Sequence, residues 1–123
     1  MCKNDNYRIW KIVRFKLGYC VDEELMKEFL CEKRPLSIAL KATPLQTYVS
    51  GIFDSNNTRC PSSGINHSAL LVGYGTDLAT GLDYWIVKNS WGKVWGENRY
   101  FRIRRGNEVC GINCYVITAI VEF

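Results

Sequence analysis

The chain of 123 residues contains little histidine, methionine or proline. The low histidine content is the most informative, because His67 is the single histidine. No Cys-x-x-Cys pair accompanies it. Because a structural zinc site needs several cysteine or histidine ligands at characteristic spacings, this composition argues against a metal centre. We therefore expect neither a metal nor a cofactor.

Long apolar stretches are also missing. No run of apolar residues is long enough to cross a bilayer, so we expect no membrane partner. Residues 1–6 are polar and lack the apolar segment of a signal peptide. The six cysteines and the glycosylation sequon Asn56-Asn57-Thr58 are nevertheless typical of oxidising compartments. A secretory composition without a leader indicates that an upstream part of the protein is absent.

Basic residues outnumber acidic ones, with 16 Lys and Arg against 12 Asp and Glu. They gather in residues 11–16 and 99–105, where they alternate with apolar residues. Such alternation predicts strands with one buried face and one solvated, basic face. A nucleic-acid-binding patch is the alternative, but solvated charged faces are far commoner, so we expect no nucleic-acid partner.

The apolar pattern predicts one α+β domain. Asp22 is placed to cap a helix that ends before Pro35, and its apolar face would carry Leu25, Met26, Phe29 and Leu30. Strands are predicted at 7–19, 36–42, 67–75, 83–88, 99–105 and 115–121, with loops at 51–64 and 76–82. The segment 67–75 is almost wholly apolar, which predicts burial on both sides. We expect an antiparallel sheet curled into a barrel, with one helix.

His67 begins the strand at 67–75, and Asn89 follows the expected hairpin partner at 83–88, so both should emerge at one end of the sheet. An asparagine amide can accept a hydrogen bond from one imidazole nitrogen, which directs the other nitrogen at a nucleophile. Trp91 would cover this bond and strengthen it by excluding water. Singly, these are a strand-end histidine, a turn asparagine and a packing tryptophan. Their joint spacing indicates a catalytic site.

Several segments carry a family resemblance. They read NHSALLVGYG at 66–75, YWIVKNSWG at 84–92, WGE at 95–97 and CGI at 110–112, with PLSIA at 35–39 and GIF at 51–53 upstream. In this order they resemble the papain family of cysteine proteases, the cathepsins included. The resemblance covers most of the chain. It implies that residues 1–123 form the right-hand, C-terminal domain of the papain-like fold, with the cysteine-bearing N-terminal half absent.

The resemblance also implies roles for particular residues. His67 is the expected catalytic histidine, Asn89 orients it and Trp91 shields the pair. In such enzymes the imidazolium lowers the pKa of a cysteine, the thiolate attacks a peptide carbonyl, and the histidine protonates the leaving amine. The positions that match the S2 substrate pocket are Ala39, Asn66, Ser68 and Tyr115. A tyrosine at the pocket floor would favour small or aliphatic P2 side chains.

Two departures from the family pattern stand out. The family nucleophile lies in a Cys-Gly-Ser-Cys-Trp segment of the N-terminal half, and no cysteine here has that context. Arg99 stands where the family usually has glycine, so a positive φ at this position would be strained.

The cysteines are expected to serve structure. By the resemblance, Cys60 and Cys110 form a disulfide, and Cys2 matches a cysteine whose partner belongs to the other half. A bridge between Cys20 and Cys31 is disfavoured, because an intact helix between them separates its ends by ~15 Å. The residues without a clear family counterpart are Cys20, Cys31 and Cys114.

Two functions follow from this sequence. The first is a cysteine-type endopeptidase that is present here as its C-terminal half and is inactive alone because it lacks the nucleophile. The substrates of the parent enzyme would be peptides or proteins. We expect the parent enzyme to be lysosomal or secreted. The alternative is a non-catalytic module that binds a propeptide-like segment or a separate N-terminal half. Its binding face would be the apolar surface around His67, Trp91 and Tyr115.

Overall fold

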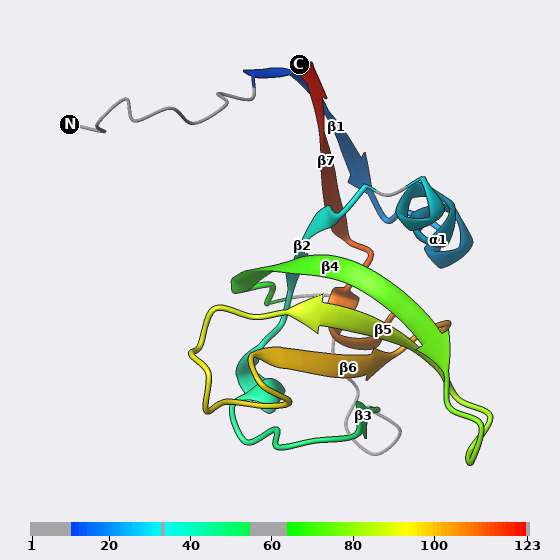
Figure 1. Ribbon diagram of the computed structural model, residues 1–123, viewed down its shortest axis with the longest axis vertical. Helices are drawn as coiled ribbons and strands as arrows, with labels where there is room; N and C mark the ends of the chain where they lie inside the picture. Colours follow the sequence, from blue (N-terminus) through cyan, green and yellow to red (C-terminus); the bar gives the residue numbers. More distant parts are fainter. Residues whose placement is uncertain (1–10, 33, 55–63, 123) are drawn as a thin grey trace.

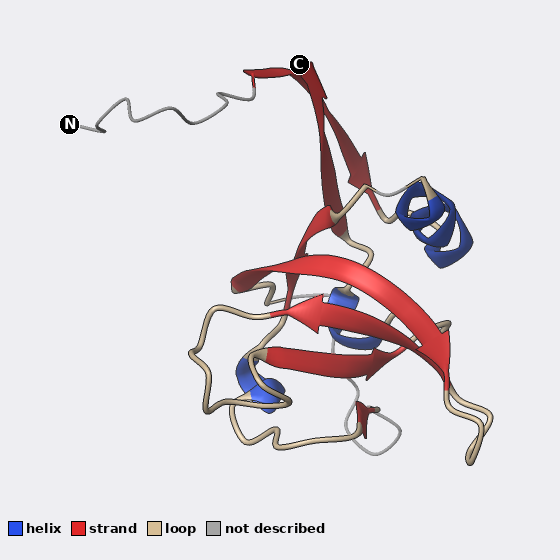
Figure 2. Cartoon of the chain, in the orientation of Figure 1, coloured by secondary structure: helices blue, strands red, loops and turns tan. Residues whose placement is uncertain are grey.

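A computed structural model describes residues 11–32, 34–54 and 64–122 of the chain. Seven strands form a single sheet, in the order β1-β7-β2-β4-β5-β6-β3, accompanied by one α-helix and two short 3₁₀ helices (Figures 1 and 2). This arrangement confirms the α+β prediction. In chain order, the elements are β1 (Lys11–Tyr19), α1 (Glu23–Cys31), β2 (Leu36–Leu40), η1 (Thr43–Leu45), β3 (Ile52–Phe53), β4 (His67–Thr76), β5 (Asp83–Lys88), β6 (Tyr100–Arg104), η2 (Val109–Gly111) and β7 (Tyr115–Glu122).

The sheet differs from the prediction at its edges. β1 and β3 lie at opposite ends of the strand order, so within the described ranges the sheet is open and the barrel does not close. β3 pairs in parallel with β6, inside the segment 51–64 that was predicted to be loop. A strand of two residues is too short to give a readable periodicity. Residues 55–63 of that segment, and residues 7–10 of the first predicted strand, lie outside the described residues.

The start of α1 agrees with the sequence. The Asp22 side chain accepts a hydrogen bond from the Glu24 backbone N–H at 2.8 Å, which satisfies one of the donors that a helix leaves unpaired at its first turn. Met26 is fully buried, and Phe29 and Leu30 pack partly against the core. α1 therefore lies against the sheet along one apolar face.

Glu23 fixes the position of α1 against the sheet. Its buried carboxylate accepts hydrogen bonds from the Trp85 indole N–H at 2.8 Å and from the backbone N–H groups of Gly106 at 2.9 Å and Glu108 at 3.2 Å. A carboxylate can be buried in this way because several donors replace the water that it loses. Three segments of the chain are thereby joined through one side chain.

The hydrophobic core lies on one side of β2, β4, β5 and β6. Its fully or almost fully buried strand residues are Leu36, Ile38, Leu40, Leu71, Trp85, Val87, Phe101 and Ile103. On the other side of β4, Leu70 and Val72 are 37% and 39% exposed. The prediction that this strand is buried on both sides is therefore wrong, because nothing in the described part of the chain covers its second side.

The uncovered side of the sheet is apolar over a wide area. Strand register places Tyr19 opposite Tyr115 and Leu17 opposite Ile117, and cross-strand partners project to the same face. Ile117 and Leu70 both pair with Ser37, one from each neighbouring strand. We call this surface the outer sheet face and define it by residues that are 37–68% exposed, namely Phe15, Leu17, Tyr19, Leu70, Tyr115 and Ile117.

β1 and β7 form an arm at one end of the sheet. β7 pairs with β2 through Tyr115–Ile117 only, but with β1 along its whole length. Residues 11–16 and 118–122 therefore pair only with each other among the described strands, and Figure 1 shows this two-stranded arm leading away from the remaining strands. In the part of the chain described here, no helix has the length and apolar character needed to traverse a membrane.

Candidate active site

The hairpin of β4 and β5 brings His67 and Asn89 together. β4 starts at the end of the sheet where β5 finishes (Figure 1), and their antiparallel register pairs Leu70 with Lys88, the residue before Asn89. His67 Nε2 and Asn89 Oδ1 lie 2.8 Å apart. The two residues that the sequence singled out as catalytic are thus in direct hydrogen-bond contact.

The neighbouring backbone determines the direction of this hydrogen bond. The Ser90 backbone N–H donates to Asn89 Oδ1 at 2.8 Å. Because an N–H group can only donate, the amide atom that it meets must be the oxygen, and this excludes the flipped amide. The oxygen then has to accept from His67 as well, so the proton of the neutral imidazole is on Nε2. Nδ1 remains as the nitrogen that can take a proton from an approaching thiol.

One aromatic ring packs directly against the His67–Asn89 pair, and a second ring supports the first. The Trp91 ring lies 5.0 Å from the His67 ring between centroids, tilted by 36°. Trp95 packs edge-on against Trp91 at 4.9 Å, and Asn89 is 6% exposed. Trp91 thus lies against the ring of the histidine that it was predicted to shield. A covered hydrogen bond is stronger than one exposed to water, because the local dielectric is lower.

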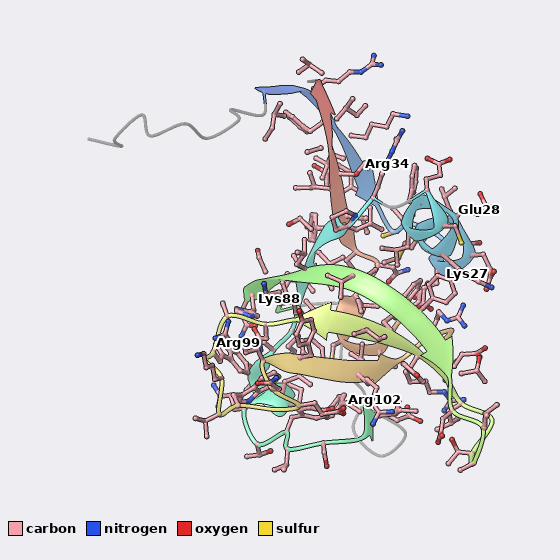
Figure 3. The ribbon with its side chains drawn as sticks, viewed as in Figure 1. Lys27, Glu28, Arg34, Lys88, Arg99 and Arg102 are labelled. Atoms are coloured by element: carbon pink, nitrogen blue, oxygen red, sulfur yellow. The ribbon has the colours of Figure 1, made fainter. Side chains whose placement is uncertain are left out.

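The backbone of Asn89 is held from the following loop. Its N–H donates to the carbonyl oxygen of Arg99 at 2.9 Å. Arg99 has φ +83°, in the region that glycine prefers, which is the strain that the sequence predicted for this position. Figure 3 shows Arg99 at the same end of the sheet as Lys88, the last residue of β5.

Three of the four predicted substrate-pocket residues form a row across the sheet. Ala39 of β2 pairs with Ser68 of β4 on one side and with Tyr115 of β7 on the other. All three therefore project to the outer sheet face, one residue along the strands from the His67 pair. Tyr115 is 44% exposed, and the Tyr19 ring packs edge-on against it at 5.4 Å.

Asn66, the fourth predicted pocket residue, uses its side chain within the fold. Its Oδ1 accepts from the Ala42 backbone N–H at 2.9 Å, and its Nδ2 donates to Thr43 Oγ1 at 3.1 Å. These bonds connect the residue before His67 to the turn after β2. The side chain of Asn66 therefore positions the start of β4.

A partly buried network beside the site was not identified from the sequence. Glu97 accepts from the Tyr48 hydroxyl at 2.6 Å, the Gly51 N–H at 2.9 Å and Arg102 Nε at 3.0 Å. The available signal was the position of Glu97 inside the Trp-Gly-Glu motif, two residues after Trp95, which contacts Trp91. The network ties the loop that follows the site to the segment before β3.

The charges in this network perturb each other. Burial raises the pKa of Tyr48 to about 12, and its hydrogen bond to Glu97 acts in the same direction. Burial opposes ionisation of Glu97, but the hydrogen bonds from Tyr48, Arg102 and Gly51 outweigh it, so the pKa of Glu97 is lowered. Glu97 is therefore a carboxylate at neutral pH, and the network is fully paired.

The predicted disulfide between Cys60 and Cys110 cannot be compared with the structure, because Cys60 lies outside the described residues. Cys110 is buried in η2. Cys2 is likewise outside the described ranges. Cys20, Cys31 and Cys114 carry free thiols in the structure.

Comparison with known proteins identifies the family. The family described as papain family cysteine protease matches residues 1–120. The chain is 40% identical over 114 residues to the viral cathepsin of Adoxophyes honmai nucleopolyhedrovirus, covering 92% of this chain and 32% of that protein. It is 44% identical over 94 residues to cathepsin L of Sarcophaga peregrina, covering 74% of this chain and 27% of that protein. The chain thus spans about a third of the length of these relatives.

Solved structures give the same result. Digestive procathepsin L2 from the larval midgut of Tenebrio molitor superposes with a TM-score of 0.79 at 33% identity, covering 89% of this chain and 34% of that chain. Bromelain from Ananas comosus, solved in complex with the E64 inhibitor, gives a TM-score of 0.78 at 34% identity and covers 90% of this chain and 51% of that chain. The sequence match extends over almost the whole chain, and the fold agrees with it. The chain belongs to the papain family of cysteine proteases.

Proposed function

We propose that this chain is the general-base half of a papain-type cysteine endopeptidase and hydrolyses peptides only together with a cysteine-bearing N-terminal half. The observation that carries the proposal is the hydrogen bond from His67 Nε2 to Asn89 Oδ1. It leaves Nδ1 of the same ring as the proton acceptor of the site. None of the chain's own cysteines has the sequence context of the family nucleophile.

The chemistry of the complete site follows from these atoms. Nδ1 of His67 would take the proton of a cysteine thiol supplied by the N-terminal half, and the resulting ion pair would hold the sulfur as thiolate. The thiolate adds to a peptide carbonyl, and the imidazolium returns its proton to the leaving amine. Asn89 keeps the ring in orientation through both transfers, since its oxygen accepts from Nε2 whether the ring is neutral or charged.

The outer sheet face supports the need for a second half. Its tyrosines, leucines, phenylalanine and isoleucine are 37–68% exposed, and neighbouring exposed apolar side chains form a surface on which another protein can pack. The row of Ala39, Ser68 and Tyr115 lies on this face, so a half that docks here would enclose the S2 pocket between the two parts. We propose a peptide substrate with a small or aliphatic P2 side chain, because the Tyr115 ring fills part of the pocket floor.

A lysosomal or secreted setting is proposed for the complete protein. The chain contains six cysteines, and among its relatives are proteins named cathepsins. Oxidising compartments are where structural disulfides persist.

The first experiment uses the chain alone. We expect no turnover of fluorogenic dipeptide substrates and no covalent labelling of any cysteine by E-64, because a general base without its nucleophile contributes little. Hydrolysis by the purified chain that is lost in His67→Ala would contradict the proposal.

The second experiment mixes the chain with the cysteine-bearing part of the Adoxophyes honmai nucleopolyhedrovirus cathepsin, prepared as a separate fragment. We expect substrate turnover and E-64 labelling of the added fragment, both lost in His67→Ala. Leu78→Ala, a change at a residue that is 97% exposed in the β4–β5 loop, is the matched control and should keep full activity.

The same mixture tests the alternative function. Exposure of the outer sheet face also favours a non-catalytic module that binds a propeptide-like segment or a separate N-terminal half. Binding that is lost in Leu70→Lys but kept in Leu78→Lys, without any turnover, would establish this module in place of the enzyme. Absence of both binding and turnover would contradict both functions.

A further inference from the structure

Two of the cysteines without family counterparts meet at the end of the β1–β7 ladder. Tyr19 pairs with Tyr115, and the next residues outward are Cys20 and Cys114. The Cys20 backbone N–H donates to the Cys114 carbonyl oxygen at 3.1 Å, and the Val21 N–H donates to the Asn113 carbonyl oxygen at 2.9 Å. Cys20 and Cys114 therefore lie opposite each other one position beyond the last pair of the ladder, joined by one backbone hydrogen bond. Cysteines on backbone segments that adjoin in this way are candidates for a disulfide.

The two thiols are close enough to influence each other, since the neighbouring Cys20 contributes to the raised pKa of the Cys114 thiol. Cys20 is exposed and Cys114 is partly buried. Cys31, at the other end of α1, is directed away from Cys20, since its sulfur lies 2.8 Å from the hydroxyl oxygen of Tyr74 in β4. Among the described cysteines, Cys114 is therefore the neighbour that Cys20 can reach without a change of fold.

We propose that Cys20 and Cys114 are a redox pair that closes to a disulfide across the end of β1 and β7. The oxidant is a low-molecular-weight disulfide such as oxidised glutathione. The exposed Cys20 thiolate attacks one sulfur of the oxidant, forming a mixed disulfide and releasing one thiol. Cys114 then attacks the Cys20 sulfur and releases the second thiol. Two protein thiols lose two protons and two electrons in all, and the oxidant takes them up as two thiols.

The order of attack follows from the environment of each thiol. Burial raises the pKa of the Cys114 thiol above its usual range, and the neighbouring Cys20 and Glu108 raise it further. Cys114 is therefore mostly protonated at neutral pH, and its small thiolate fraction reacts second, once a mixed disulfide at Cys20 places an electrophilic sulfur beside it. Cys20, which is solvent-exposed, is the residue that an external oxidant can reach first.

The bond would stiffen a part of the fold that borders the outer sheet face. It would join the backbones directly beyond Tyr19 and Tyr115, whose rings already pack edge-on. Cys20 has φ +48°, a strained value for a residue other than glycine. A covalent link would hold this turn in place, and with it the strand that carries Tyr115.

The test is disulfide mapping of the purified chain. After incubation with oxidised glutathione and blocking of free thiols, peptide mass spectrometry without reduction should find a peptide that joins Cys20 to Cys114. Cys31→Ser should retain this peptide, and Cys20→Ser should lack it. Oxidation should raise the thermal midpoint by about 10 °C in the wild type, and this rise should disappear in Cys114→Ser.

The disulfide map of the wild-type chain tests the proposal even without the variants. A wild-type chain in which Cys20 stops at the glutathione adduct, or in which Cys20 pairs with Cys31 or any other cysteine, overturns it. If Cys114→Ser does not fold, the position of the cross-link in the wild type still decides.

Discussion

Asn89 is bound on three sides, through its backbone N–H and twice through its side-chain oxygen, while its buried Nδ2 group has no hydrogen-bond partner in the structure. A residue with this many fixed contacts cannot rotate, so the orientation of the imidazole depends on it. Removing the amide should free the ring of His67 to exchange between its two neutral tautomers.

This can be measured on the isolated chain, because His67 is the only histidine. With ¹⁵N-labelled histidine, the NMR signals of the neutral ring in the wild type should show its proton on Nε2. Asn89→Ala should give a mixture of tautomers. Asn107→Ala is the control, because it removes an exposed amide from the loop before η2, and it should leave the tautomer unchanged. An unaltered tautomer in Asn89→Ala would show that other contacts orient the ring.

Arg99 offers a stability test at the same scale. A non-glycine residue at φ +83° is strained, and glycine adopts this conformation without cost from a Cβ atom. Arg99→Gly should raise the free energy of unfolding by about 0.5–1 kcal/mol. Arg99→Ala removes the same charge but keeps the Cβ atom, so it should have little effect. Urea denaturation of the wild type, Arg99→Gly and Arg99→Ala measures the three free energies of unfolding. Equal values for the glycine and alanine variants would show that backbone strain at Arg99 does not lower the stability of the wild type.

The sequence predicted the residues of the site more completely than their supports. His67, Asn89 and Trp91 could be identified because their order and spacing reproduce a family pattern. The Ser90 N–H that defines the amide orientation is a backbone group, and no side-chain pattern reports it. Glu97 lies within a recognised motif, but its partners Tyr48 and Gly51 are almost fifty residues away, so only the fold connects them.

At the scale of elements, the buried carboxylate of Glu23 carries the attachment of α1 to β5. Glu23→Ala would leave the Trp85 indole N–H and two backbone N–H groups without their acceptor. We expect the free energy of unfolding to fall by about 2–3 kcal/mol, the usual cost of unsatisfied buried donors. Glu24→Ala is the control, since it removes an exposed carboxylate from the same helical turn. Thermal or urea unfolding should show a much smaller loss for Glu24→Ala, and equal losses would mean that the helix-end charge, not the buried contacts, is responsible.

The Glu97 network should make stability depend on pH. The folded pKa of Glu97 is lowered, so the unfolded chain binds a proton at this group first as the pH falls. Its contribution to stability is thus fully present above the ordinary glutamate pKa of 4.5 and is lost as the pH falls through the lower folded value.

Glu97→Gln removes this titration while retaining an acceptor for the Gly51 N–H. The difference in unfolding free energy between the wild type and this variant should shrink between about pH 6 and about pH 3. A difference that stays constant over this range would show that Glu97 does not stabilise the fold through its charge.

The strand β4 shows why sequence pattern alone misjudged one element. Its residues are apolar on both faces, a pattern that normally indicates burial on both sides. In the structure only the Leu71 side is covered, while Leu70 and Val72 are exposed. The pattern of the strand therefore reflects an apolar surface that no other described segment of the chain covers.

At the scale of the whole molecule, the arm of β1 and β7 should be the least stable part of the sheet. Two strands alone are marginally stable in water, and beyond Ile117 this pair has no third strand among the described residues. Amide hydrogen exchange followed by mass spectrometry should find faster exchange in residues 11–16 and 118–122 than in β4, β5 and β6. Equal protection in the arm and the central strands would mean that the arm is covered in solution.

The outer sheet face has a consequence for the amount of this protein that a cell can maintain. A chain that exposes such a surface is a ligand for chaperones and a substrate for degradation until another protein covers it, and binding shifts the folded population by mass action. If another protein covers this face, the steady-state level of the chain should follow the concentration of that protein more closely than the rate at which the chain is synthesised. Chains that stay uncovered would be degraded before they accumulate.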